Sequence, residues 1–251
     1  MASRRGQMLD GVLLLDKPEG LSSNHALQRA KRTLDARKAG HTGTLDPFAT
    51  GLLVCCFGRA TKISANMLEA DKTYQARLRF GEETDSGDLT GVVTFQAPPS
   101  FEGVSSAALE EALQAFRGEI EQIPPMYSAL KRDGKPLYEY ARQGIELERP
   151  PRRVTIYRLE LLSCSGLDAD VLVHCSKGTY IRTLAQDIGR RLGCGAHLSA
   201  LRRTGAGPFD LKDGITLEAL QALPDPKTAL LALHALPAGL LPESFKLKDE
   251  L

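Results

Sequence analysis

The stretch from Gly40 to Gly51 limits the possible folds of this chain more than any other segment. It contains three glycines, three threonines and a proline, together with His41 and Asp46. Glycine and proline interrupt both the helical and the strand period, while threonine and aspartate favour local turns. The apolar run 52–54 follows directly, so we expect a rigid loop held against the core. Because such loops often carry catalytic groups, His41 and Asp46 are candidate site residues.

Composition sets broad limits on what the protein can be. The chain has 251 residues, 42% of them hydrophobic and 25% charged, which is typical of a globular protein that is not embedded in a membrane. Its formal net charge is only +1, so local basic patches would have to hold any anionic partner. We find no run of 18 apolar residues and no signal-peptide pattern. The five cysteines show no zinc or C-x-x-C spacing, so we expect buried thiols in a reducing cytoplasm.

Periodicity predicts a mixture of short strands and helices. Strands are expected at 12–15, 52–57, 73–80, 154–164, 169–175 and 196–203. Helices are expected after the N-cap candidates at 22–24 and at 61–70, 105–116 and 180–192. A Leu/Ala-rich tail with Thr216 as an N-cap candidate is expected to be helical, and residues 81–91 are expected to form an acidic loop.

The segment from 120 to 153 differs from its surroundings. Prolines and glycines recur throughout it, together with tyrosines and many basic residues. Few regular elements fit such a pattern, so we expect a protruding insertion that contacts a partner.

Several common chemistries have no motif here. The chain lacks a Walker phosphate loop, a complete dinucleotide fingerprint, H-E-x-x-H and G-x-S-x-G, and its histidines show no metal-ligand spacing. The sequence thus offers no motif for a nucleotide or metal site. On residue type alone, Asp46 would close a turn with Pro47, Tyr74 would be a core tyrosine and Arg182 a solvated charge.

Read together, several stretches resemble one family. The run 40–51 closely resembles the catalytic motif of pseudouridine synthases, and in particular of the bacterial tRNA pseudouridine synthase B family. Further similar stretches follow in order along residues 11–205, at 11–18, 71–74, 123–131, 176–184 and 193–198. The resemblance implies an α/β (α+β) pseudouridine synthase fold, with a mixed, mostly antiparallel central sheet flanked by helices and a protruding RNA-binding insertion.

The same resemblance implies a reaction. The enzyme would isomerise uridine to pseudouridine at position 55 in the T-loop of tRNA, without a cofactor. Asp46 would be the nucleophile, attacking either C6 of the uracil or C1′ of the ribose. Arg182 would pair with Asp46, Tyr74 would stack on the target base, and His41 would fill the space that the flipped base leaves. Tyr180 and Leu201 would line the pocket.

The partner implied is the T-stem and T-loop of tRNA, bound by a monomer that needs no protein partner. Affinity would come largely from phosphate contacts. The candidate contacts are Arg29, Lys31 and Arg32 before the catalytic loop, and Lys131, Arg132, Arg142, Arg152 and Arg153 in the insertion. The density of basic and aromatic residues favours RNA binding over a merely solubilising surface.

The resemblance also implies a domain scheme. We expect a flexible N-terminus at 1–10, a catalytic domain at 11–210 and a helical tail at 211–251. Bacterial members usually continue into a small RNA-binding PUA domain, for which the segment after 210 is too short. Two alternatives remain open: an RNA chaperone that refolds tRNA, and a guide-RNA-dependent enzyme. Asp46→Asn should abolish pseudouridine formation yet leave binding and refolding intact.

Overall fold

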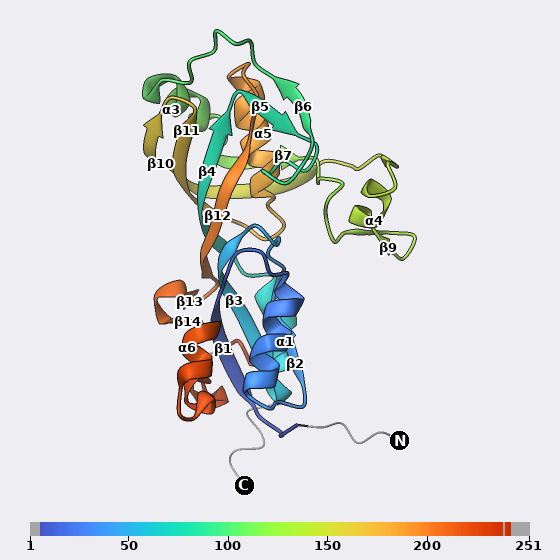
Figure 1. Ribbon diagram of the computed structural model, residues 1–251, viewed down its shortest axis with the longest axis vertical. Coiled ribbons are helices and arrows are strands. Elements are labelled where there is room, and N and C mark those ends of the chain that lie inside the picture. The colour runs from blue at the N-terminus through green and yellow to red at the C-terminus, as the bar shows by residue number, and fades with distance from the viewer. Residues whose placement is uncertain (1–5, 238, 242–251) are drawn as a thin grey trace. The chain divides into compact units, whose positions relative to one another are not determined.

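The computed structural model describes residues 6–237 and 239–241. Its backbone divides into two compact units, one built from residues 1–73 and 202–251 and the other from 74–201 (Figure 1). The division into a catalytic domain at 11–210, with its insertion at 120–153, and a tail at 211–251 remains a prediction. The described part leaves out residues 1–5 of the predicted flexible N-terminus. It also leaves out residues 238 and 242–251 of the predicted tail. Within the described part, Gln7 forms backbone hydrogen bonds with Asp35 and Arg37.

The first unit is built around a sheet with the strand order β14-β1-β3-β12. Its strands are β1 (Gly11–Lys17), β2 (Ala39–His41), β3 (Thr50–Phe57), β12 (Ala196–Ala206), β13 (Phe209–Asp210) and β14 (Ile215–Thr216). Strand β3 pairs antiparallel with β1 and β2, whereas β14 runs parallel to β1 and β12 parallel to β3. Residues 196–201 of β12 are assigned to the second unit.

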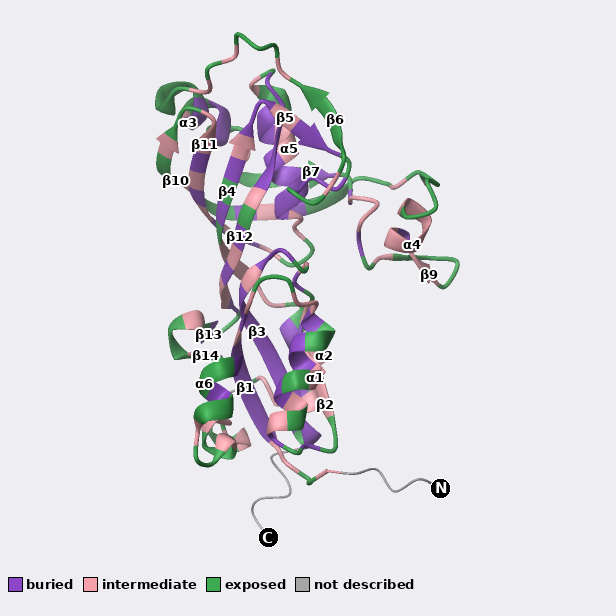
Figure 2. Ribbon diagram, viewed as in Figure 1, coloured by how far each residue is buried: buried purple, intermediate pink, exposed green. Residues whose placement is uncertain are grey.

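Both faces of β1 and β3 are buried (Figure 2). Alternate residues of the two strands contribute to two apolar clusters. One cluster includes helix α1 (Ser23–Thr33) and helix α6 (Leu217–Ala222), and the other includes the 3-10 turn η1 (Gly58–Ile63) and helix α2 (Ser64–Leu68). This burial explains why both strands read as continuous apolar runs in the sequence.

Capping residues set where the helices of the first unit begin. Ser22 caps α1 by accepting a hydrogen bond from the His25 amide, and Thr216 caps α6 through the Ala219 amide, so both predicted caps are confirmed. The described tail after 210 contains β14 and α6 together with the short 3-10 helices η2 (Leu211–Asp213), η3 (Pro226–Ala229) and η4 (Leu233–Ala235).

The second unit contains a sheet with the strand order β12-β4-β11-β10-β7. These strands are β4 (Lys72–Phe80), β7 (Gly118–Gln122), β10 (Arg152–Ser165) and β11 (Asp168–Cys175), together with β12. Helix α3 (Ser106–Gln114) packs on β10 and contacts helix α5 (Ile181–Arg191). The expected mixed, mostly antiparallel sheet flanked by helices is thus confirmed.

Two smaller elements complete this unit. Strands β5 (Glu82–Thr84) and β6 (Val93–Gln96) form a hairpin. The insertion carries strands β8 (Lys131–Arg132) and β9 (Lys135–Pro136) and helix α4 (Leu137–Ala141), most of it exposed or half-buried (Figure 2). None of the helices in the described residues is long and apolar enough to cross a membrane.

Three local expectations were wrong. The ends of the 40–51 stretch are not loop, because β2 extends to His41 and β3 begins at Thr50. The helix expected at 61–70 is divided between η1 and α2. The acidic segment 81–91 is not simply a solvated loop, because it contains β5 and because Glu83 and Asp88 are buried. Cross-strand pairing and buried partners outweighed local composition at these positions.

Candidate active site

The catalytic-loop candidate, residues 42–49, is fixed at several points within the first unit. The hydroxyl of Ser23, the first residue of α1, accepts a hydrogen bond from the Leu45 amide at 2.7 Å and lies 2.9 Å from the Leu45 carbonyl oxygen, to which it donates. The Gly20 amide donates to the Pro47 carbonyl at 2.8 Å, and the Ala49 amide closes a turn on the Asp46 carbonyl at 3.1 Å. Because its neighbours are anchored in this way, Asp46 sits on a restrained backbone.

Lys17 lies beside this loop with a fully buried side chain. Its ammonium donates to the carbonyl oxygens of Pro18 at 2.8 Å, Leu21 at 2.7 Å and Pro47 at 3.4 Å. Burial lowers the pKa of Lys17 to about 8, while the negative charge of half-buried Asp46 opposes that shift. The ammonium is therefore still largely protonated at pH 7, and it is a cation whose field favours the ionised form of Asp46.

His41, at the end of β2, pairs with Cys55 of β3 and is half-buried. Burial lowers the pKa of His41, and the nearby Arg203 guanidinium lowers it further. His41 is therefore a neutral imidazole at pH 7, able to stack or to hydrogen-bond.

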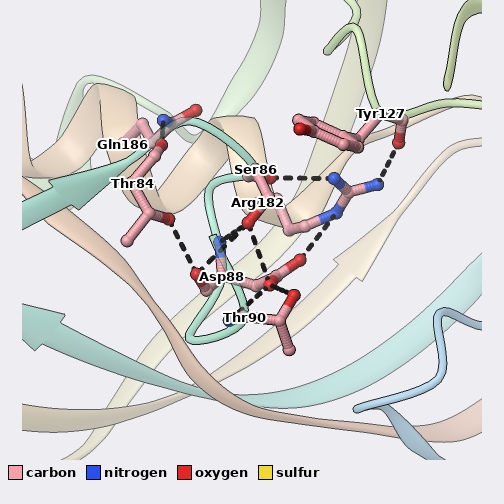
Figure 3. Close-up of polar contacts among 7 residues, drawn as sticks. All are labelled: Thr84, Ser86, Asp88, Thr90, Tyr127, Arg182 and Gln186. Atoms are coloured by element: carbon pink, nitrogen blue, oxygen red, sulfur yellow. Dashed lines mark hydrogen bonds and ion pairs between the residues drawn. The ribbon is translucent and has the colours of Figure 1, made fainter. Parts of the chain in front are cut away.

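Arg182 makes several polar contacts within the second unit (Figure 3). It is the second residue of α5 and only 6% exposed, so its interpretation as a solvated charge is wrong. Its guanidinium donates to the Ser86 carbonyl at 2.8 Å and to the Tyr127 carbonyl at 2.7 Å, and its Nε lies 3.8 Å from Asp88 Oδ2.

The carboxylate of Asp88 is itself held in place. Its Oδ1 accepts hydrogen bonds from the Ser86 hydroxyl at 3.0 Å, the Thr90 amide at 2.9 Å and the Thr90 hydroxyl at 2.6 Å (Figure 3). Sequence reasoning missed Asp88 because the acidic segment looked solvated. The pattern Ser-x-Asp-x-Thr was a usable signal, since short polar side chains at this spacing bond to one another and to local backbone.

The other predicted pocket residues of the second unit lie on three elements. Tyr74 is half-buried on β4, on the same face as buried Ala76 and Leu78. Tyr180 precedes α5, and Gln122 bonds to both its amide and its carbonyl at 3.0 and 3.2 Å. Leu201 is buried on β12.

The predicted residues thus fall into two groups. The first unit contains Asp46 and His41. The second unit contains Tyr74, Tyr180, Arg182 and Leu201. Within its own unit the first group lies with Lys17 and Arg203, and Arg182 lies with Asp88. The pairing of Asp46 with Arg182 remains a prediction.

The candidate RNA contacts are at surface positions except for Lys31, which is half-buried. Two cations of the insertion lie over tyrosine rings, Arg142 at 5.2 Å from the Tyr138 centroid and Lys135 at 4.5 Å from that of Tyr140. Arg153 is 3.4 Å from Glu119, an exposed ion pair. Across residues 6–237 and 239–241, no group of three or more His, Cys, Asp or Glu side chains is arranged to hold a metal ion.

Comparison with family models gives two adjoining matches. One, described as the N-terminal domain of the TruB family pseudouridylate synthases, covers residues 31–181. The other, described as the C-terminal domain of tRNA pseudouridylate synthase B, covers residues 182–239.

Named relatives agree with these matches. The tRNA pseudouridine synthase B of Bordetella avium is 77% identical over 242 residues, which is 96% of this chain and 99% of the relative. That of an Azoarcus species is 63% identical over 218 residues, covering 87% of this chain and 72% of the relative.

Solved structures share the fold. In a crystal structure of a Cbf5–Nop10–Gar1 complex, one chain matches with a TM-score of 0.70 and 31% identity, over 90% of this chain and 60% of that one. A structure of an H/ACA RNP bound to a substrate RNA containing 2′-deoxyuridine matches with a TM-score of 0.66 and 27% identity, over 92% of this chain and 65% of that one. This chain therefore spans less than two thirds of either of those longer chains.

Proposed function

The chain belongs to the tRNA pseudouridine synthase B family, and from this premise we propose that its target is uridine 55 in the T-loop of tRNA and its nucleophile Asp46. Enzymes of this family isomerise uridine in tRNA to pseudouridine, and this chain is such an isomerase. We propose in addition which uridine is modified and which residues act on it.

The reaction requires one ionised carboxylate. The C1′–N1 bond of uridine breaks, a C1′–C5 bond forms, and the proton lost from C5 is balanced by the proton gained at N1. Asp46 forms a transient covalent bond with either C1′ or C6, so that the uracil can turn while one fragment is held. Both routes are redox-neutral and need no further reactant.

The observation that best supports this role is the setting of Asp46 in the first unit. Its loop is fixed through Ser23, and the buried ammonium of Lys17 donates to the carbonyl of the next residue, Pro47. A cation beside a carboxylate favours its ionised, nucleophilic form, whereas burial alone would favour protonation. A fixed backbone keeps the orientation that covalent attack requires.

The base must leave its stack before Asp46 can reach it, at a cost of about a few kcal/mol. We assign stacking on the flipped uracil to Tyr74, which can also assist removal of the C5 proton. His41 would occupy the vacated place in the T-loop, a role that suits a neutral, flat imidazole. Arg182 would pair with Asp46, and Tyr180 and Leu201 would line the pocket.

RNA binding is assigned to the insertion and to α1. The two cation–tyrosine pairs of the insertion offer both charge and flat surface to a nucleic acid. The related H/ACA RNP structure, which holds a substrate RNA, supports RNA as the ligand of this fold. We further propose that the protein acts in the cytoplasm as a monomer without a protein partner.

The assignment of the target is tested with unmodified tRNA transcripts. After incubation with the protein, pseudouridine is mapped by chemical probing over the whole transcript. We expect modification at position 55 only, and none in a matched transcript that carries cytidine there. Modification at another position would overturn the proposed target.

A further inference from the structure

Arg203 is a buried arginine to which the proposed reaction gives no role. It lies on β12, is 2% exposed and pairs in register with Gly51 of β3. Its guanidinium donates three hydrogen bonds to backbone carbonyls, from Nε to Leu52 at 2.8 Å, from Nη2 to Gly43 at 3.2 Å and from Nη1 to Thr44 at 3.5 Å.

These acceptors lie on both sides of Asp46 in the sequence. Gly43 and Thr44 belong to the arm of the loop that precedes Asp46, and Leu52 belongs to the strand that follows it. A guanidinium is planar and rigid, so one side chain can fix the separation of two backbone segments. Burying a cation costs free energy unless its N–H groups are hydrogen-bonded. The Arg203 guanidinium is therefore stable in the core only while these carbonyls stay in place.

We propose that Arg203 is a positioning residue, which links residues 43–44 of the loop to Leu52 of β3 and thereby holds Asp46 in place. This inference rests on the proposed role of Asp46. Arg203 itself contacts backbone and is not assigned to the substrate.

Close packing supports the assignment. Gly51 has φ +98°, and a Cβ there would lie 2.3 Å from the Arg203 carbonyl oxygen, so the two strands meet where only glycine fits. Arg203 also influences His41, whose pKa its charge helps to lower. A single buried side chain thus contacts the loop that carries Asp46 and lowers the pKa of His41 on β2.

The neighbouring arginine provides a matched control. Arg202 is on the same strand, but its side chain is 41% exposed. It bonds to the Asp16 carboxylate at 2.7 and 3.1 Å and donates to the Thr50 hydroxyl, at the start of β3, at 3.3 Å. Its substitution changes an arginine on β12 without removing a bond to the backbone carbonyls of Gly43, Thr44 or Leu52.

The test compares Arg203→Lys, Arg203→Gln and Arg202→Lys with the wild type. Single-turnover rates of pseudouridine formation and dissociation constants for tRNA are measured with each protein. A lysine keeps the charge but cannot bond at once to the carbonyls of the loop and to that of Leu52. The Arg203→Lys protein should therefore react about 100-fold more slowly. Its tRNA affinity should be unchanged, and Arg202→Lys should match the wild type in both respects.

A second readout needs no RNA and separates this inference from the proposed function. NMR titration of His41 in the free protein should give a raised pKa in Arg203→Gln, because a cation is lost. It should remain low in Arg203→Lys and in Arg202→Lys. If the wild type did not modify position 55 but His41 still responded in this way, the proposed function would fail and the contact of Arg203 with the loop would stand.

Two results would overturn the positioning role. One is a folded Arg203→Lys protein that reacts as fast as the wild type. The other is loss of folding in both Arg203 variants, which would make Arg203 a residue of the core with no separate effect on the loop.

Discussion

The guanidinium of Arg182 and the carboxylate of Asp88 lie 3.8 Å apart, and each side chain is only 6% exposed. Ser86 and Thr90 fix the carboxylate, while the carbonyls of Ser86 and Tyr127 hold the guanidinium. The arginine predicted to act on Asp46 is therefore oriented within its own unit. It also connects the 84–90 segment with the base of the insertion.

Replacing Asp88 should affect Arg182 more than it affects RNA binding. Breaking a buried ion pair by removing one partner costs about 3–5 kcal/mol, and Asp88→Asn should cost less because the amide keeps part of the hydrogen bonding. We expect Asp88→Asn to lower the single-turnover rate at least about tenfold, since roughly 1.4 kcal/mol lost in the transition state has that effect. Dissociation constants for tRNA should stay close to the wild-type value, and a rate equal to wild type would contradict the role assigned to the pair.

Gly51 should be the least replaceable glycine of the catalytic segment. Gly51→Ala adds a Cβ next to the Arg203 carbonyl, and we expect a loss of about 3 kcal/mol or more in the free energy of unfolding. Gly20 is the control, because it also has a positive φ, +82°, but a Cβ there meets nothing within 4 Å. Gly20→Ala should cost only about 1 kcal/mol. Urea denaturation measures both, and equal costs would refute the close contact between β3 and β12.

The lowered pKa of Lys17 should make the free energy of unfolding depend on pH. Its pKa is about 8 in the folded protein and 10.5 when unperturbed, so between these values the unfolded state binds more protons. Stability from this group is therefore present above pH 10.5 and is lost as the pH falls through 8. Relative to Lys17→Met, the wild type should gain about 3 kcal/mol between pH 8 and 10.5. A difference that stays constant with pH in denaturation experiments would contradict this.

The insertion should contribute to RNA affinity through charge. For a double variant, Lys131→Ala with Arg132→Ala, we expect weaker tRNA binding and a salt dependence whose logarithmic slope falls by about 2. Arg158→Ala is the control, since Arg158 is exposed on β10 and bonds to Glu160 in the same strand. An unchanged slope in the double variant would exclude these two residues as phosphate contacts.

Sequence reasoning succeeded where local pattern and fold agree. Residues 12–15 and 52–57 read as buried strands because both of their faces are apolar, and Ser22 and Thr216 read as caps because capping is a local interaction. It failed where a distant partner decides burial. Asp88 lies in a segment that was expected to be an acidic loop, and no local pattern singled out Arg203. Only the folded chain supplies the hydroxyls and carbonyls that satisfy these two side chains.

The central claim is that Asp46 performs the chemistry on uridine 55, and Asp46→Asn tests it most directly. The amide preserves the size of the side chain but cannot act as an anionic nucleophile. Wild-type and variant proteins are incubated in excess with unmodified tRNA, and pseudouridine at position 55 is quantified over time, with tRNA binding measured in parallel. We expect the variant to bind tRNA as the wild type does and to form no pseudouridine. Product formation by the Asn variant at the wild-type rate would contradict the assignment of Asp46.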